Sequence, residues 1–323
     1  MVWYDRLRFM KISFFSIFSL VSFVLAGIAG YLLWTLKITP QVLVNPLIGS
    51  NQLKMADNVW APKDVKGAAI VASLEDITAK AAFFVDTGTG EVLYQKNANE
   101  RLPIASLTKI MTAIVSLEKL PLDKDIRISN EAAEMEPDKM FLKAGEKLTV
   151  KELMQGLFLV SANDAAEALA ESTTGRREEF LQMMNSKAKH LGMNNTYFIN
   201  PSGLQEDGVE QYSSALDVSL MAHYAIHNFP FLIDITKEPR LYISENNDHG
   251  PFDLFSGINL VTTYDGVVGF KTGYTPEAGL TLVTLARKDG KEVLGVLLGC
   301  TNRRDDAKRL LDYSFQQLGV SVE

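Results

Sequence analysis

A largely apolar stretch without any charged residue occupies positions 12–36. At about 1.5 Å per residue, a helix of this length crosses the roughly 30 Å hydrocarbon core of a bilayer. Arg6, Arg8 and Lys11 precede the stretch, and basic residues favour the cytoplasmic side of a membrane. The pattern predicts a cytoplasmic N-terminus at 1–11, one transmembrane helix at 12–36, and the remainder of the chain on the outer side of the cell membrane.

A cleaved signal peptide is the alternative interpretation of this stretch, with Ala29 as the small residue before the cut. The anchor is favoured because the apolar run continues through positions 31–34. Both interpretations export the remainder of the chain. Residues 37–67 are expected to form a linker, because prolines interrupt them and neither a helical nor a strand period persists. One globular domain is predicted at 68–323.

Changes in apolar periodicity divide the globular part into three blocks. The first block holds two predicted strands, 81–85 and 91–95, joined into a hairpin by a glycine-containing turn. The middle block has helical spacing, with a capping box at its second helix and a similar one at its last. Five helices are predicted there, at 107–117, 149–160, 164–171, 178–191 and 214–227. The last block is strand-like again before a closing helix, with strands at 267–271, 280–286 and 293–298 and the helix at 305–316.

Strands thus lie at both ends of the globular part, and helices lie between them. This order predicts an α+β fold, in which an antiparallel sheet built from both ends is flanked by helices and carries a helical insertion. Hydrophobic residues make up 47 % of the chain and charged residues 22 %, so the domain is expected to bury a substantial core.

The composition excludes several classes of function. The net charge is −7 with both signs mixed along the chain, so a nucleic-acid partner is not expected. Cys300 is the only cysteine, which excludes an intramolecular disulfide and a cysteine-based metal site. His223 and His227 are four residues apart on a predicted helix, but the metalloprotease pattern and a third ligand are missing. A structural role is expected for them, with no metal and no cofactor.

Candidate catalytic chemistry begins with Ser106 and Lys109, which share one face of a predicted helix at positions i and i+3. A serine hydroxyl needs a nearby base, and a lysine amine can serve when burial or a second cation lowers its pKa. At a helix start, free backbone N–H groups can also stabilise an oxyanion. The pair alone is weak evidence, because two other Ser-x-x-Lys pairs occur where ordinary surface helices are expected: Ser116–Lys119 and Ser186–Lys189.

Two further polar groups stand at predicted element boundaries. Ser161 and Asn163 fall between two helices, where they can point into a cleft or simply cap the second helix. Lys271, Thr272 and Gly273 lie at the end of a predicted strand. The ammonium and hydroxyl suit a carboxylate, and the glycine allows a ligand to approach the backbone. A strand end entering a turn is the plain alternative.

The three groups gain meaning from their order. Ser-x-x-Lys, Ser-x-Asn and Lys-Thr-Gly succeed one another as in the active-site serine enzymes that recognise penicillin. From about 81 to 315 the chain resembles the D-alanyl-D-alanine carboxypeptidases among the low-molecular-mass penicillin-binding proteins, whose domain has a β-lactamase/transpeptidase-like fold. The longer matches lie at 81–86, 103–109, 140–143, 200–204, 212–215 and 271–275.

The resemblance implies roles for the polar residues in acyl transfer. Ser106 would attack the carbonyl between two D-alanines, and Lys109 would take its proton. Ser161 would relay protons, and Asn163 would bond the substrate backbone. Lys271 would raise the local positive potential and help to keep Lys109 deprotonated.

The resemblance also implies a binding site for the substrate's C-terminus. Thr272, with Thr275, would hold the terminal carboxylate beside Gly273. The backbone N–H groups of Ser106 and Tyr274 would form the oxyanion hole. Relatives often carry a carboxylate-binding arginine after the last strand, where this chain offers two candidates, Arg303 and Arg304.

The activity implied is removal of the terminal D-alanine from peptidoglycan stem peptides through an acyl-enzyme on Ser106, with β-lactams as covalent inhibitors. An endopeptidase of the same family and a non-hydrolytic binder of cell-wall peptides are the alternatives. A β-lactamase is disfavoured, because no Glu-x-x-Leu-Asn string occurs. Many relatives add a second β-rich domain and a C-terminal amphipathic anchor, and the N-terminal span at 12–36 is expected to replace that anchor.

Overall fold

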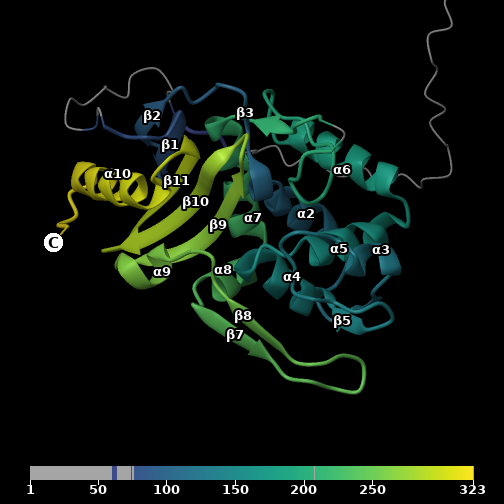
Figure 1. Cartoon of the computed structure of the whole chain (residues 1–323). Helices are drawn as coiled ribbons and strands as arrows, with labels where there is room; N and C mark the ends of the chain where they lie inside the picture. The colour runs from purple at the N-terminus through teal and green to yellow at the C-terminus, as the bar shows by residue number, and fades with distance from the viewer. Residues whose placement is uncertain (1–59, 64–73, 75, 207, 323) are drawn as a thin grey trace, which may run out of the picture. The chain divides into compact units, whose positions relative to one another are not determined.

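The computed structural model describes residues 60–63, 74, 76–206 and 208–322 (Figure 1). The chain divides into two compact units, Met1–Asp57 and Asn58–Glu323, and the description concerns the second. The predicted anchor and most of the predicted linker lie outside the described residues. Among the helices that are described, none has the length and apolar character needed to cross a membrane.

A five-stranded antiparallel sheet forms the centre of the unit, in the order β2-β1-β11-β10-β9 (Figure 1). The strands are β1 (Ala81–Asp86), β2 (Val92–Lys96), β9 (Val267–Thr275), β10 (Gly279–Lys288) and β11 (Lys291–Cys300). Ala81 pairs with Leu298, so the first and last of the described strands are neighbours. The prediction of a sheet built from both ends of the domain is confirmed.

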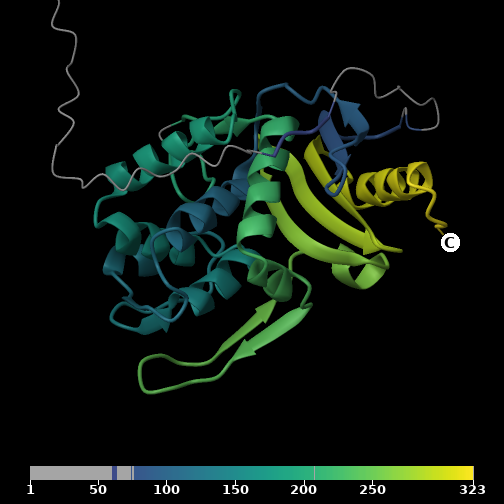
Figure 2. The same ribbon diagram turned by 180° about the vertical axis from the view of Figure 1, so that it is seen from behind.

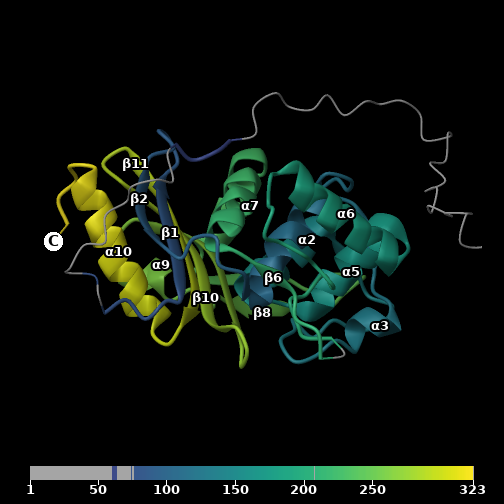
Figure 3. The same ribbon diagram turned by 90° about the horizontal axis from the view of Figure 1, so that it is seen from above.

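Helices cover both faces of this sheet, which explains why its central strands bury successive side chains over most of their length. Phe83 and Phe84 are fully buried on opposite faces, because successive side chains of a strand alternate. Phe84 packs in one cluster with Leu260 and with residues of α10 (Arg303–Gln317). Phe83 packs in a second cluster with residues of the helices in the middle of the chain. Figure 3 shows α10 and α7 (Ala215–Asn228) on opposite sides of the sheet.

The middle of the chain forms the helical part of the unit, as predicted (Figure 2). Thr149 and Glu152 make the expected capping box, in which the Thr149 hydroxyl accepts from the Glu152 N–H and the Glu152 carboxylate accepts from the Thr149 N–H. Ser214 caps α7 by accepting from the Asp217 N–H at 3.2 Å. The predicted helices are observed as α2 (Thr108–Leu117), α4 (Val150–Leu159), α5 (Asn163–Thr174), α6 (Arg177–His190) and α7.

Short elements escaped prediction because they are too brief to show a period. They are β3 (Leu102–Pro103), β4 (Asp125–Arg127), α3 (Asn130–Ala133), β5 (Lys147–Thr149), β6 (Tyr212–Ser213), α8 (Phe231–Thr236), β7 (Arg240–Ile243), β8 (Phe252–Phe255) and α9 (Leu260–Thr263). The predicted end of the strand at 271 was also wrong. β9 continues to Thr275, because Gly273 and Thr275 pair with Thr281 and Gly279 of β10.

The described part of the predicted linker, residues 60–63, contacts the globular unit. The Lys63 N–H donates to the Gly90 carbonyl at 2.7 Å. The Trp60 ring stacks on His223 of α7 with 3.9 Å between ring centroids, and His223 stacks in turn on His227 at 5.9 Å. The histidine pair therefore has a packing role at the point where the chain enters the unit.

Candidate active site

Ser106 lies in a tight turn, η2 (Ala105–Leu107), that leads directly into α2. Ala105 has a φ of 48°, a left-handed backbone conformation that residues other than glycine rarely adopt. Lys109 comes one turn later on α2, and its Nζ donates to the Ser106 Oγ at 3.0 Å. The structure thus brings the predicted nucleophile within hydrogen-bond reach of the predicted base.

Lys109 is fully buried. Burial lowers its pKa to about 7, although Asp138 and Asp164 act in the opposite direction. The Nζ also donates to the carbonyl of Ser202 at 2.6 Å. A large fraction of this amine is therefore neutral near pH 7, and its lone pair can accept the Ser106 proton.

Ser161 and Asn163 flank the junction of α4 and α5. The Ser161 Oγ accepts from the Lys271 Nζ at 2.9 Å, and Ser161 has a φ of 60°. Asn163 is the first residue of α5, whose N-cap, Ala162, supplies no side-chain bond, so neither polar residue is the N-cap of this helix.

The Asn163 amide is only half satisfied within the described residues. Its Nδ2 donates to the Glu136 carbonyl at 3.2 Å. Its Oδ1 is buried and has no hydrogen-bond partner among them. An unpaired buried acceptor costs about 1–3 kcal/mol, which an incoming N–H donor can offset. The Asn163 Oδ1 can therefore accept a hydrogen bond from a backbone N–H of an extended ligand.

β9 carries Lys271, Thr272 and Gly273 past the nucleophile. Lys271 is fully buried, and burial, followed by the nearby Lys109 and Arg303 charges, lowers its pKa. A Cβ at Gly273 would lie 2.9 Å from the Ser106 backbone nitrogen, so only glycine fits against the nucleophile turn. β9 is the last strand of the described sheet, so its outer edge has no strand partner there. The Thr236 hydroxyl donates to the Val268 carbonyl at 2.9 Å, and an extended peptide can pair with the edge beyond that point.

The remaining predicted binding residues surround this strand. Thr272 is partly exposed. Its hydroxyl lies close to Gly257, where an added Cβ would come within 3.3 Å of the Oγ1. Thr275 is buried, and its hydroxyl accepts from the Ala278 N–H at 3.1 Å. The Tyr274 side chain is exposed. The prediction for this residue concerns its backbone N–H, as a donor of the oxyanion hole.

Of the two candidate arginines, Arg303 reaches β9. Its Nη1 donates to the Gly273 carbonyl at 2.8 Å and to the Thr281 carbonyl at 3.2 Å. Arg304 is exposed one position further along α10. Arg303 thus adds a positive charge behind Gly273.

One of the two rival Ser-x-x-Lys pairs differs from expectation. Ser116 is fully buried, and its Oγ accepts from the Thr173 hydroxyl at 3.2 Å, because α2 packs against α4, α5, α6 and α7. Lys119 is exposed and lies after the end of α2. Ser116 therefore has no buried amine beside it.

Two supporting features were not assigned a role in the site by the sequence-based prediction. The first is the Ser202 carbonyl on Lys109, together with Gly203, whose Cβ would lie 2.1 Å from the Ala105 carbonyl. The second is Asp164, whose carboxylate accepts from the Met140, Leu142 and Ala165 N–H groups at 2.8–3.1 Å. The Asn-Pro-Ser-Gly turn signal marks the first feature in the sequence, but a main-chain acceptor has no signature of its own.

Known proteins similar to this chain were found at the level of family, sequence and structure. A family profile described as D-alanyl-D-alanine carboxypeptidase matches residues 68–302. The D-alanyl-D-alanine carboxypeptidase DacF of Bacillus subtilis is 39% identical over 285 residues, which cover 86% of this chain and 71% of that protein. DacC of Escherichia coli is 34% identical over 254 residues, covering 74% of this chain and 62% of that protein. The Streptomyces K15 DD-transpeptidase, known from a crystal structure, is 32% identical in sequence to this chain and superposes on it with a TM-score of 0.70. The aligned residues cover 74% of this chain and 98% of the transpeptidase chain.

Proposed function

Since the chain belongs to the D-alanyl-D-alanine carboxypeptidase family, we propose that it removes the terminal D-alanine from peptidoglycan stem peptides through an acyl-enzyme on Ser106. The observation that carries the proposal is the buried Lys109 amine 3.0 Å from the Ser106 hydroxyl. A serine with such a base is an activated nucleophile, which a protein that only binds cell-wall peptides would not need.

Acylation begins when neutral Lys109 takes the Ser106 proton. The Ser106 Oγ forms a bond to the carbonyl carbon between the two D-alanines, and the oxyanion is held by the backbone N–H groups of Ser106 and Tyr274. The C–N bond then breaks, and its electron pair stays on the departing nitrogen. The proton returns from Lys109 to that nitrogen by way of Ser161, so free D-alanine leaves. Water, deprotonated by the same base, cleaves the ester and restores Ser106.

The substrate's terminal carboxylate is bound by the positive end of the site. Arg303 supplies the charge beside Gly273, the bound carboxylate favours the protonated form of Lys271, and the Thr272 hydroxyl, with Thr275, supplies hydrogen bonds. The substrate backbone extends along the open edge of β9 and bonds the free Oδ1 of Asn163. A β-lactam has the same carboxylate and a strained amide, so it acylates Ser106 and remains attached.

The proposal is tested by release of D-alanine from a peptide ending in D-Ala-D-Ala. The matched control is the same peptide ending in D-Ala-L-Ala, which should remain intact. Faster cleavage of cross-linked muropeptides than of the linear peptide would favour an endopeptidase. Binding of the peptide without any cleavage would overturn the proposal.

We further propose that the enzyme is anchored by residues 12–36, with its catalytic unit outside the cytoplasm. Support comes from the uncharged apolar stretch, from the basic residues before it, and from a substrate that lies in the cell wall. Protease added to intact spheroplasts should digest the catalytic unit. Protection of the unit until the membrane is broken would contradict this placement.

The pH dependence of acylation should reflect the protonation of Lys109. Its pKa is lowered to about 7, so the neutral amine predominates above that pH and falls about tenfold for each pH unit below it. The second-order rate of acylation by a penicillin is therefore expected to fall tenfold between pH 6 and pH 5. A rate that stays constant over this interval would show that Lys109 is not the base.

A further inference from the structure

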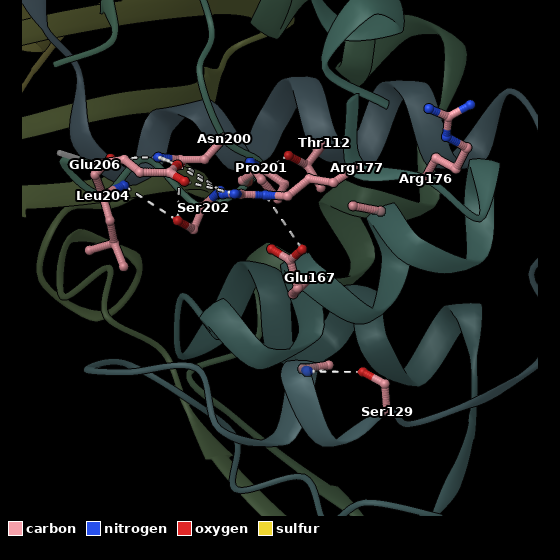
Figure 4. Close-up of polar contacts among 12 residues, drawn as sticks. Thr112, Ser129, Glu167, Arg176, Arg177, Asn200, Pro201, Ser202, Leu204 and Glu206 are labelled. Atoms are coloured by element: carbon pink, nitrogen blue, oxygen red, sulfur yellow. Dashed lines mark hydrogen bonds and ion pairs between the residues drawn. The ribbon is translucent and has the colours of Figure 1, made fainter. Parts of the chain in front are cut away.

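The turn at residues 200–204 lies against the face of α2 that carries Lys109 and Thr112. Figure 4 shows Pro201 of this turn beside Thr112. The Pro201 carbonyl accepts from the Thr112 hydroxyl at 2.6 Å, and the Ser202 carbonyl accepts from the Lys109 Nζ at 2.6 Å. Gly203 touches the Ala105 carbonyl so closely that no side chain fits between them. The 200–204 turn thus sets the position of both the base and the nucleophile turn.

The Ser202 carbonyl has a directional effect on Lys109. A neutral amine has two N–H donors and one lone pair. With one N–H directed to Ser202 at 2.6 Å, rotation of the amine is restricted, and its lone pair can face the Ser106 Oγ at 3.0 Å. Because a carbonyl can only accept, it cannot compete with Ser106 for the lone pair.

Asn200 holds the 200–204 turn together from inside. It is 2 % exposed, and its Oδ1 accepts from the Ser202 N–H, the Ser202 hydroxyl, the Gly203 N–H and the Gln211 side chain at 2.8–3.2 Å. Its Nδ2 donates to the Leu204 carbonyl at 2.7 Å. The turn is therefore internally rigid, and its position relative to α2 depends on what fastens it from outside.

An ion pair connects the 200–204 turn region to α6. It joins Glu206 to Arg177, the first residue of that helix. The two Nη atoms of Arg177 donate to the two carboxylate oxygens of Glu206 at 2.7 and 2.8 Å. Glu206 also lies 3.4 Å from the Asn200 Nδ2, and Arg177 lies 3.7 Å from the buried Glu167 of α5. Figure 4 shows this chain of contacts running from α5 and α6 to the turn. A bidentate pair fixes both distance and orientation.

We propose that Arg177 and Glu206 are positioning residues, which hold the 200–204 turn so that the Ser202 carbonyl aims Lys109 at Ser106. This inference rests on the proposed acyl transfer, but it concerns two residues that touch neither the substrate nor the reacting atoms. Arg177 acts on Glu206, Glu206 acts on the 200–204 turn, and the turn acts on Lys109.

The test compares Arg177→Met and Glu206→Gln with Arg176→Met. Arg176 is the adjacent arginine, pairs with Glu179 on the surface, and points away from the network (Figure 4). The rate of acylation by a fluorescent penicillin and kcat for the D-Ala-D-Ala peptide are expected to fall about tenfold in the first two variants, because small misplacement of a catalytic group is enough. KM should change less than twofold, and Arg176→Met should match the parent.

A charge exchange separates positioning from general loss of structure. The triple variant Arg177→Glu, Glu206→Arg and Glu167→Gln restores an ion pair at the same place without setting two carboxylates against each other, and is expected to recover kcat to within about threefold of the parent. An Arg177→Met enzyme that acylates as fast as the parent would overturn the inference. Equal loss of kcat in the single and exchanged variants, with unchanged melting temperature, would also overturn it. A parent enzyme that does not acylate would instead refute the proposed function.

Discussion

Replacing Lys109 with methionine is expected to lower the rate of acylation by at least about 10³-fold and to leave the fold intact. A positioned base contributes about 10²–10⁴-fold, and here the same amine also returns the proton to the leaving group. Methionine fills the fully buried space of the lysine stem and removes the cost of burying an amine. The Ser202 carbonyl loses its donor in this variant, so the two effects oppose each other and the unfolding free energy should change by less than about 2 kcal/mol. Stopped-flow acylation by a penicillin and urea unfolding of the same preparation measure both quantities.

Lys119→Met is the matched control for this variant. Lys119 also comes three positions after a serine, but it is exposed and has no part in the site. Its replacement should leave the acylation rate within twofold of the parent. A Lys109→Met enzyme that retains a tenth of the parent rate would mean that another group takes the Ser106 proton.

Gly203→Ala is expected to lower activity at least about 10²-fold and the unfolding free energy by about 2–4 kcal/mol. A Cβ at this position would lie 2.1 Å from the Ala105 carbonyl and 2.9 Å from the Ser106 N–H. Both contacts are backbone atoms of the nucleophile turn, so relief requires the 200–204 turn or Ser106 to move. Either shift separates Lys109 from Ser106. Urea titration and D-alanine release test the two effects together.

Gly192→Ala separates crowding from backbone strain. Gly192 has a φ of 78°, comparable to the 96° of Gly203, but a Cβ there meets nothing within 4 Å. The left-handed conformation alone costs a side chain about 1–2 kcal/mol. Gly192→Ala should show that loss of stability with full activity. Equal activity in the two alanine variants would exclude a close contact between Gly203 and the nucleophile turn.

Elements with strong local signals could be predicted from the sequence. The capping box at Thr149 and Glu152 placed the start of α4 at the observed residue, because the two side chains satisfy backbone groups that only a helix end leaves free. The hairpin of β1 and β2 and the long strands β10 and β11 were equally clear, since their apolar runs are bounded by turn residues. Strands at both ends of the domain then led to the prediction of one antiparallel sheet built from both ends, which is observed.

Features that depend on distant partners could not be predicted. The extension of β9 to Thr275 results from pairing with β10 rather than from its own polar residues. Burial of Ser116 results from the helices that enclose α2, and its sequence neighbourhood beside Leu120 and Pro121 gives no sign of them. The ion pair of Arg177 and Glu206 joins two segments whose sequence separation conceals their contact.

The candidate site was predictable as a set of side chains and not as a geometry. Ser106, Lys109, Ser161 and Lys271 were named from three short motifs, their order and the family resemblance, and the structure brings them together in two hydrogen-bonded pairs. The Ser202 carbonyl on Lys109 is a main-chain atom, so residue type could not indicate it. The Asn163 Oδ1 has no hydrogen-bond donor beside it among the described residues. This property likewise depends on the tertiary fold and could not be read from the sequence.

Mass spectrometry of the enzyme after reaction with a penicillin tests the acyl-enzyme on Ser106 most directly. One adduct is predicted, on the proteolytic peptide that contains Ser106. It should be absent from Ser106→Ala and retained in Ser186→Ala, which removes an exposed serine of the other Ser-x-x-Lys pair. An unmodified parent enzyme, or an adduct that persists in Ser106→Ala, would contradict a serine acyl-enzyme at this site.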